Sequence, residues 1–175
     1  VAMLDRLKLS AIRDQLDTLL DEAARSKMTL REALAFFVSR EIARRDERRI
    51  SMASKLAQFP FVREIDGFEF DAQPSLDPGQ IRELVTCRWI AHGDTTLFLG
   101  PPGTGKTHLA VALGREAIRQ NYSVQFVTAA TLVAMLAKAH SDGTLDKQLT
   151  QLARPKLLII DELGYLPFEA NAAHL

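Results

Sequence analysis

The sequence predicts an α/β protein in which an N-terminal helical region precedes a parallel sheet flanked by helices. Up to about residue 60, apolar residues recur at helical spacing. Beyond residue 95, short apolar runs alternate with amphipathic segments, and a glycine-rich turn follows the first run. This alternation is typical of parallel strands joined by helices.

The first 60 residues are expected to form a helical region that binds DNA or a partner. Apolar positions at helical spacing predict one helix over residues 3–25. Thr29 and Glu32 form a capping box, which starts a second helix that runs to about Leu56. Residues 61–78 are predicted to be a linker because they are rich in Pro and Gly.

The second domain is expected over residues 79–175. Asp77 before Pro78 marks the start of a helix that reaches about Ile90. The expected strands are residues 95–99, 123–128 and 156–160, and the expected helices are 106–120, 131–139 and 145–154. The third strand is almost wholly apolar, as a strand covered on both faces should be.

Composition narrows the class of protein. No apolar run approaches the roughly 20 residues that cross a bilayer, so no membrane partner is expected. Cys87 is the only cysteine, which excludes an internal disulfide and favours a cytoplasmic location. We expect Cys87 to be a small buried hydrophobic residue. The net charge is zero, with a basic excess in the first 60 residues and an acidic excess after them.

The segment G-P-P-G-T-G-K-T matches the phosphate-binding pattern G-x-x-x-x-G-K-[ST] at every fixed position. Its glycines let backbone N–H groups turn toward phosphate oxygens, Lys106 supplies a cation for the β- and γ-phosphates, and Thr107 offers a hydroxyl to Mg²⁺. The cofactors expected are therefore ATP and Mg²⁺. The candidate nucleotide-binding residues are Gly100, Pro101, Pro102, Gly103, Thr104, Gly105, Lys106, Thr107 and His108. The alternatives are that the loop matches the phosphate-binding pattern by chance and that His108 has a packing or surface role.

The segment L-L-I-I-D-E ends the third predicted strand. It brings Asp161 to the carboxyl edge of the sheet, where such sheets bind ligands. There Asp161 can hold Mg²⁺ through water, and Glu162 can orient a water for attack on the γ-phosphate. Two solvated acids at a strand end are the alternative. Thr128 ends the second strand, where a helix cap is favoured over a role in sensing phosphate.

Two further features leave alternatives open. Trp89 and Ile90 are candidates either for contact with adenine or for core packing. The helix before residue 56 carries an arginine stripe, defined as Arg40, Arg44, Arg45, Arg48 and Arg49. This stripe is suited to the phosphates of a DNA backbone, without base-specific contacts. Pairing of its arginines with Glu41, Asp46 and Glu47 is the alternative.

Several segments resemble those of known ATPases. G-P-P-G-T-G-K-T, the acid pair that ends the third strand and D-E-L-G-Y resemble the AAA+ ATPases. R-E-I-A-R-R-D-E-R-R, G-F-E-F and C-R-W-I-A-H-G are similar to the IstB family, whose members are ATPase helpers of insertion-sequence transposition related to DnaC helicase loaders. The resemblance extends over essentially the whole chain.

This resemblance implies an AAA+ core that binds ATP, a homo-oligomer assembled on DNA, and a transposase as partner. Carried over by motif, Gly103, Gly105, Lys106 and Thr107 would bind nucleotide, Asp161 would serve Mg²⁺, and Glu162 together with Lys106 would serve catalysis. AAA+ sheets have five strands in the order 5-1-4-3-2, and only three are predicted here, so we expect an incomplete core. Its sensor and arginine-finger positions would follow residue 175, and such a fragment should bind ATP weakly and not hydrolyse it.

Three other functions stay open at the level of sequence. A DnaC-like helicase loader would share the chemistry and differ in its partner. A P-loop kinase of small molecules would pair Phe98 with Ile159 in adjacent strands. A catalytically inactive remnant would still bind DNA through its helical region.

Overall fold

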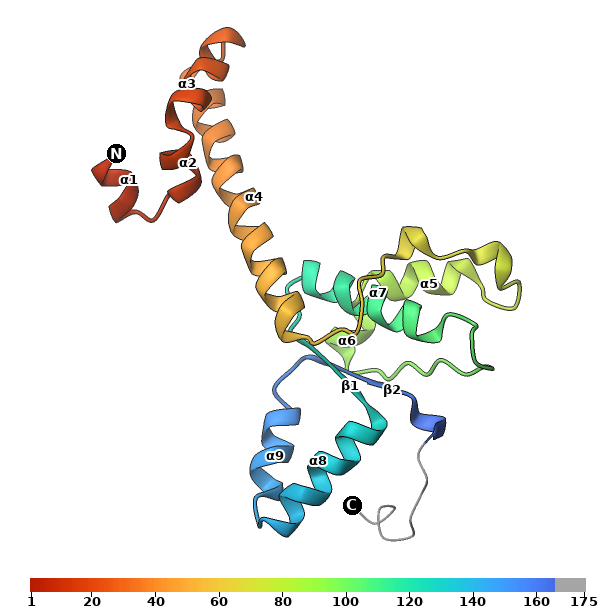
Figure 1. The fold of residues 1–175 in the computed structure, drawn as a ribbon. Coiled ribbons are helices and arrows are strands. Elements are labelled where there is room, and N and C mark those ends of the chain that lie inside the picture. The colour runs from red at the N-terminus through yellow and green to blue at the C-terminus, as the bar shows by residue number, and fades with distance from the viewer. Residues whose placement is uncertain (166–175) are drawn as a thin grey trace. The chain divides into compact units, whose positions relative to one another are not determined.

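A computed structural model describes residues 1–165 (Figure 1). The chain divides into two compact units after residue 52. The first unit comprises Val1–Met52, and the second begins at Ala53. The last ten residues of the predicted second domain, 166–175, lie outside the described residues. Among residues 1–165, no helix has both the length and the apolar character that a membrane span requires.

Four helices form the first unit, and the last of them continues into the second. They are α1 (Ala2–Arg6), α2 (Ser10–Asp14), α3 (Leu16–Arg25) and α4 (Leu30–Leu56). The single helix predicted over residues 3–25 is wrong, because Lys8 has a φ of 55° and Gln15, at the end of α2, leaves the helical conformation. The capping box is confirmed: the backbone N–H of Thr29 donates to Glu32 Oε2 over 2.8 Å.

The predicted linker packs into the second unit. It contains two short 3₁₀ helices, η1 (Ile65–Gly67) and η2 (Phe70–Ala72). Next come α5 (Pro78–Val85), capped by Asp77, and α6 (Arg88–His92). The sequence predicted one helix here, and a left-handed backbone at Cys87 (φ 56°) divides it.

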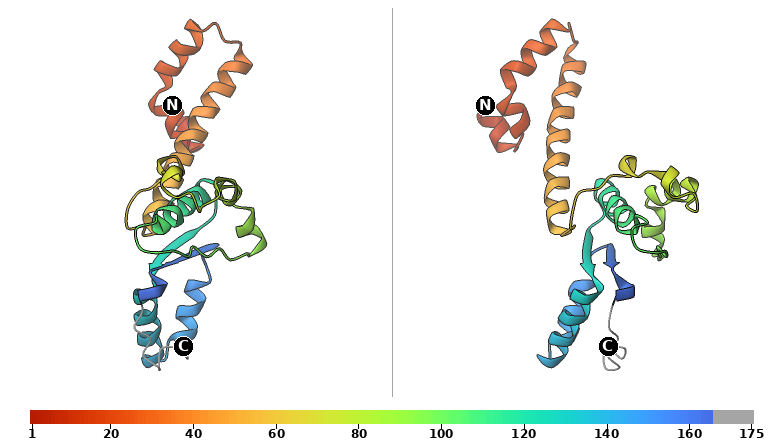
Figure 2. Two further views of the ribbon diagram at one scale, coloured as in Figure 1. Left: turned by 90° about the vertical axis from the view of Figure 1, so that its right-hand side faces the viewer. Right: turned by 45° about the vertical axis from the view of Figure 1, so that its right-hand side comes forward.

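The sheet of the described chain has two parallel strands, β1 (Val124–Thr128) and β2 (Leu157–Asp161) (Figure 1). Their register pairs Val124 with Leu157 at one end and Thr128 with Asp161 at the other. α7 (Lys106–Arg119) precedes β1, and α8 (Ala129–Ser141) and α9 (Leu145–Leu152) connect β1 to β2. The two connecting helices lie side by side (Figure 2), and η3 (Leu163–Tyr165) follows β2.

The strand predicted over residues 95–99 is absent from the described sheet. A strand exists through hydrogen bonds to a neighbour, and no described segment pairs with these residues. Leu97 and Leu99 are exposed, whereas Phe98 packs against the apolar cluster of Phe68, Ile81 and Leu109. Ile159 pairs with Phe126, so the pairing with Phe98 expected of a small-molecule kinase is not found among the described residues.

Helix α7 packs closely against the sheet. Val111, Ala117 and Ile118 of α7 are fully buried. At Gly114, a Cβ atom would come within 2.7 Å of Ile159 Cδ1 and 2.9 Å of the Phe59 ring. The absence of a side chain at Gly114 therefore lets the middle of α7 lie close to β2, the strand whose end carries Asp161.

Cys87 is buried, as predicted. Burial, followed by the nearby charge of Glu116, raises the pKa of its thiol to about 11. The thiol therefore stays protonated near neutral pH and packs as a small apolar group.

Candidate functional site

The glycine-rich loop, residues 100–107, leads directly into α7. Gly105 precedes Lys106, the first residue of α7, and has a φ of 84° that favours glycine. Gly103 has a φ of 79°. A Cβ atom at residue 105 would also lie only 2.6 Å from Phe68 Cε2, so this position demands glycine for two independent reasons.

Lys106 folds back over its own loop. Its Nζ donates to Gly100 O over 2.8 Å and to Pro101 O over 2.7 Å. Thr104 Oγ1 also donates to Pro101 O, over 2.9 Å. The ammonium group is thus held within the loop, where phosphate oxygens can replace the carbonyl acceptors.

Thr107 and Asp161 meet although 54 residues separate them. Thr107 Oγ1 donates to Asp161 Oδ2 over 2.9 Å. Mg²⁺ prefers oxygen ligands and usually keeps several of its waters. The Thr107 hydroxyl is therefore suited to bind Mg²⁺ and the Asp161 carboxylate to hold it through water, with Lys106 adjacent for the phosphates. Within residues 1–165, no group of three or more His, Cys, Asp or Glu side chains is arranged so that it could hold a metal ion.

Glu162 and Thr128 lie at the same edge of the sheet. Glu162 is exposed, follows Asp161 directly and has a φ of 60°, which is uncommon for a residue other than glycine. Its role in activating water stays a prediction. The cap role of Thr128 is confirmed, because its Oγ1 accepts from the backbone N–H of Thr131 at the start of α8.

A cavity of about 520 Å³ adjoins the glycine-rich loop. This volume is within the usual range of ligand pockets, roughly 300–1,000 Å³. One wall consists of Gly103, Thr104, Gly105 and His108; the other consists of Val62, Arg63, Glu64, Gly67, Phe68, Glu69, Ala72 and Gln73. We call the second wall, residues 62–73, the strap. Trp89 and Ile90, the predicted candidates for adenine contact, are not among these lining residues, and Trp89 Nε1 donates instead to Leu84 O.

Sequence reasoning missed the strap because it was assigned to a linker. Phe68 is buried in a cluster with Ile81 and Leu109, and its ring packs edge-on against the His108 ring at 5.3 Å between centroids. His108 Nε2 lies 3.0 Å from Glu64 O, and a carbonyl only accepts, so Nε2 is the donor. The signal that could have found the strap is its aromatic content, since Phe68 and Phe70 are unusual in a solvated linker.

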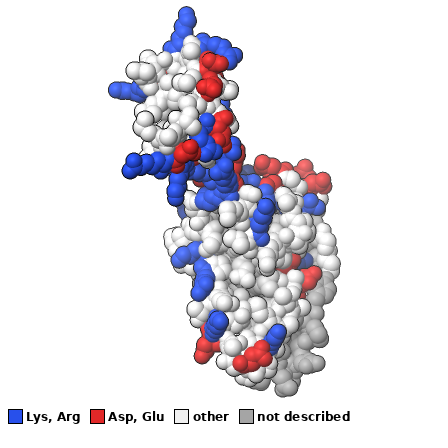
Figure 3. Space-filling view, turned by 60° about the vertical axis from the view of Figure 1, so that its left-hand side comes forward, with Lys and Arg blue, Asp and Glu red and all other residues white. Residues whose placement is uncertain are grey.

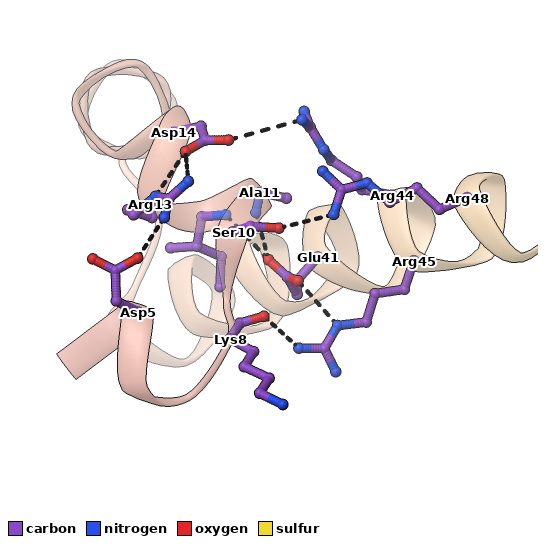
Figure 4. A network of polar contacts seen from close by, with 11 residues as sticks. Asp5, Lys8, Ser10, Ala11, Arg13, Asp14, Glu41, Arg44, Arg45 and Arg48 are labelled. Carbon is purple, nitrogen blue, oxygen red and sulfur yellow. Dashed lines mark hydrogen bonds and ion pairs between the residues drawn. The ribbon is translucent and has the colours of Figure 1, made fainter. Parts of the chain in front are cut away.

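The arginine stripe lies on α4 and contacts the preceding helices of its own unit (Figure 4). Arg45 Nε donates to Glu41 over 3.0 Å, and its Nη2 donates to Lys8 O over 2.8 Å. Arg48 donates to Ser10 Oγ over 3.2 Å. Longer ion pairs join Arg44 to Asp14 (3.8 Å), Arg40 to Glu22 (3.9 Å) and Arg49 to Asp46 (3.4 Å).

The partners of the stripe agree in part with the predicted alternative. Glu41 and Asp46 were expected, whereas Asp14 and Glu22 belong to other helices and could not be inferred from spacing within α4. Figure 3 shows acidic side chains among the basic ones where Lys and Arg gather on the drawn face. Contact between the stripe and DNA stays a prediction.

A glycine-rich loop that begins a helix, beside an acid that ends a parallel strand, defines the P-loop class of α/β proteins. The family model described as IstB-like ATP binding protein matches residues 2–175. This chain belongs to that family.

Relatives include proteins described as ATP-binding proteins of insertion sequences. One, of IS5376 in Geobacillus stearothermophilus, is 41% identical over 169 residues, covering 97% of this chain and 67% of the relative. Another, of IS21 in Pseudomonas aeruginosa, is 36% identical over 173 residues, covering 99% and 65%. A third, of IS232 in Bacillus thuringiensis subsp. berliner, is 34% identical over 172 residues, covering 98% and 69%. The chain thus spans about two thirds of the length of these relatives.

Proposed function

We propose that this chain binds magnesium-ATP through the glycine-rich loop and acts as an ATP-dependent helper of transposition, assembling on DNA to assist a transposase. The single observation that carries the nucleotide part is the 2.9 Å contact between Thr107 and Asp161, next to Lys106. Membership of the IstB-like family supports the part that concerns transposition.

In the proposed complex, each residue has a distinct task. Backbone N–H groups of the loop and the start of α7 bind the phosphates, and Lys106 exchanges its carbonyl acceptors for phosphate oxygens. Thr107 and Asp161 would hold Mg²⁺, which offsets the charge of the phosphates when it is bound. Glu162 would orient the attacking water if the complete assembly hydrolyses ATP.

The cavity beside the loop is proposed to take the nucleoside part of ATP. It continues from Gly103 and Gly105, where the phosphates would lie, to the strap. The edge of Phe68 and the ring of His108 give it an aromatic and partly apolar lining, which suits a purine.

DNA contact is assigned to the arginine stripe, through phosphates and not base edges. Homo-oligomerisation belongs to the proposal because nucleotide hydrolysis in such machinery commonly uses an arginine from a neighbouring subunit. The transposase is proposed as partner, and the names of the relatives, which are insertion-sequence ATP-binding proteins, support a role in transposition.

Titration of the chain with magnesium-ATP to millimolar concentration, followed by calorimetry, tests the nucleotide part. We expect weak saturable binding that is lost in Lys106→Ala and reduced in Asp161→Asn. A matched control is Lys138→Ala, which removes a lysine from α8 away from the loop. Equal binding by wild type and Lys106→Ala would contradict the proposal.

The alternative partner is a replicative helicase, as in DnaC-like loaders. Co-purification of the chain with a transposase, and not with a replicative helicase, would support the transposition helper. The reverse result would support the loader.

A further inference from the structure

The strap is held against α7 by two kinds of contact. Phe68 anchors it in the apolar cluster with Ile81 and Leu109. Glu64, at the beginning of the strap, adds an ionic contact to two arginines of α7. Since the strap contains only two single-turn 3₁₀ helices, these contacts replace the regular hydrogen bonds that would order a strand or a long helix.

Glu64 makes hydrogen bonds and ion pairs with residues on one face of α7. Its Oε1 accepts from Arg115 Nη2 over 2.6 Å and from Arg115 Nε over 3.0 Å, and its Oε2 accepts from Arg119 over 2.7 Å. Its backbone carbonyl accepts from His108 over 3.0 Å. His108, Arg115 and Arg119 are seven and four residues apart and therefore share a face of the helix. Glu64 thus contacts α7 from the first turn of this helix to its last turn.

The contacts of Glu64 concern the part of the site that would bind the nucleoside, and not the part that would bind the phosphates. The phosphates are served by the glycine-rich loop, which Glu64 does not contact through any described hydrogen bond or ion pair. The nucleoside would lie in the cavity, of which the strap forms one wall. If that wall were loose, binding would have to order it and would lose affinity to the entropy of ordering.

We propose that Glu64 is a positioning residue that orders the strap and thereby selects for the nucleoside part of the ligand, without acting on the phosphates. This inference rests on the proposed function, because it assumes that the cavity and the loop bind one nucleotide together. Glu64 does not need to touch the nucleotide in order to act.

The experiment compares magnesium-ATP with magnesium-tripolyphosphate, which carries the phosphates and lacks the nucleoside. For Glu64→Gln we expect about tenfold weaker binding of ATP, equivalent to about 1.4 kcal/mol, and unchanged binding of tripolyphosphate. Glu116→Gln is the matched control: it removes a second carboxylate paired with Arg119, on the same helix, and leaves the contacts between Glu64 and α7 in place. It should bind both ligands like the wild type.

Each outcome has a separate meaning. Wild type that binds neither ligand refutes the proposed function itself. Wild type that binds tripolyphosphate as tightly as ATP refutes a nucleoside site in the cavity, and a Glu64→Gln variant that changes neither affinity or lowers both equally refutes the role of Glu64. Arg115→Gln, which breaks the same contact from α7, should reproduce the selective loss and serves as the test if Glu64→Gln does not fold.

Discussion

Gly105 meets two requirements that have separate physical origins. The backbone at this position has a φ of 84°, which favours glycine. In addition, a Cβ atom here would lie 2.6 Å from the Phe68 ring, so packing also excludes a side chain. The first was foreseeable from the motif, because glycine admits this conformation freely. The second comes from the strap, which the sequence assigned to a linker.

We expect Gly105→Ala to destabilise the second unit by more than the conformational cost alone, which is about 1–2 kcal/mol for a left-handed residue with a Cβ atom. It should also abolish the binding of magnesium-ATP, since Phe68 or the loop must move. Gly143→Ala is the matched control, because Gly143 has a φ of 67° and open space around it. Thermal unfolding and calorimetry of both variants test this expectation. Equal losses of stability in the two variants would mean that contact between the new methyl group and Phe68 adds no destabilisation.

Glu41 is the one buried charged residue among the buried residues of the described chain. Its carboxylate accepts from the backbone N–H groups of Ala11 (2.7 Å) and Ile12 (3.3 Å), at the start of α2, and from Arg45. Burial alone would raise its pKa, but the contacts with Arg45 and with the two amides outweigh burial and lower the pKa below the usual 4.5. A residue of α4 thus caps a helix some 30 positions earlier.

Glu41→Gln should therefore cost the first unit roughly 1.5–3 kcal/mol near neutral pH, as expected for hydrogen bonds to a charged group. Because the pKa is lowered on folding, this stability is present above pH 4.5 and is lost as the pH falls through the lowered pKa. Hydrogen exchange of the Ala11 and Ile12 amides reports it directly. The exposed Glu47→Gln variant should exchange like the wild type, and a Glu41→Gln difference that persisted fully in strong acid would contradict this account.

At the scale of elements, the sequence predicted best where the signal is local. The start of α4 was found from Thr29 and Glu32, which satisfy each other within one turn. The breaks at Lys8 and Cys87 were missed, because apolar spacing does not reveal a single left-handed residue. The strand at residues 95–99 was wrong because pairing depends on a partner distant in sequence, which propensity does not encode.

In the candidate site, too, the sequence predicted what local motifs specify and did not predict what depends on contacts distant in sequence. The loop and Asp161 were recognised from motifs, whereas the hydrogen bond between Thr107 and Asp161 became visible only in the structure. The strap was not found, since its role depends on contacts with α7 such as those of Glu64. The interhelical partners of the arginine stripe were missed for the same reason.

The spacing of α7 from β2 depends on Gly114. Replacing a glycine within a helix by alanine ordinarily stabilises the helix by about 1 kcal/mol. Here the new methyl group would meet Ile159 and Phe59 within 3 Å, and such overpacking costs about 1–3 kcal/mol. We expect Gly114→Ala to lower the unfolding temperature, and a rise would show that the contact relaxes freely. Trimming the partner in a Gly114→Ala, Ile159→Val double variant should recover part of the loss.

At the scale of the whole molecule, the two units carry separate proposed tasks. The first unit has the arginine stripe, and the second has the glycine-rich loop and the cavity. The stripe also serves its own unit, since Arg45 and Arg48 make hydrogen bonds of 2.8–3.2 Å to residues 8–10 and to Glu41. Arg40 and Arg44 have longer ion pairs to give up when they meet a phosphate, and Arg40 also lies 5.1 Å from the centre of the Phe36 ring.

DNA binding is therefore expected to depend most selectively on Arg40 and Arg44. The Arg40→Gln, Arg44→Gln variant should bind duplex DNA more weakly at every salt concentration and reduce the slope of log affinity against log salt by about 1.8, or 0.9 for each lost phosphate contact. Its thermal stability should change little, because exposed ion pairs of 3.8–3.9 Å contribute little. Arg45→Gln should instead destabilise the first unit, since it removes a positively charged partner of buried Glu41. Lys106→Ala should leave DNA binding intact if the tasks of the two units are separate. An unchanged salt slope in the double variant would remove Arg40 and Arg44 from the proposed DNA contact, whatever the second unit does with ATP.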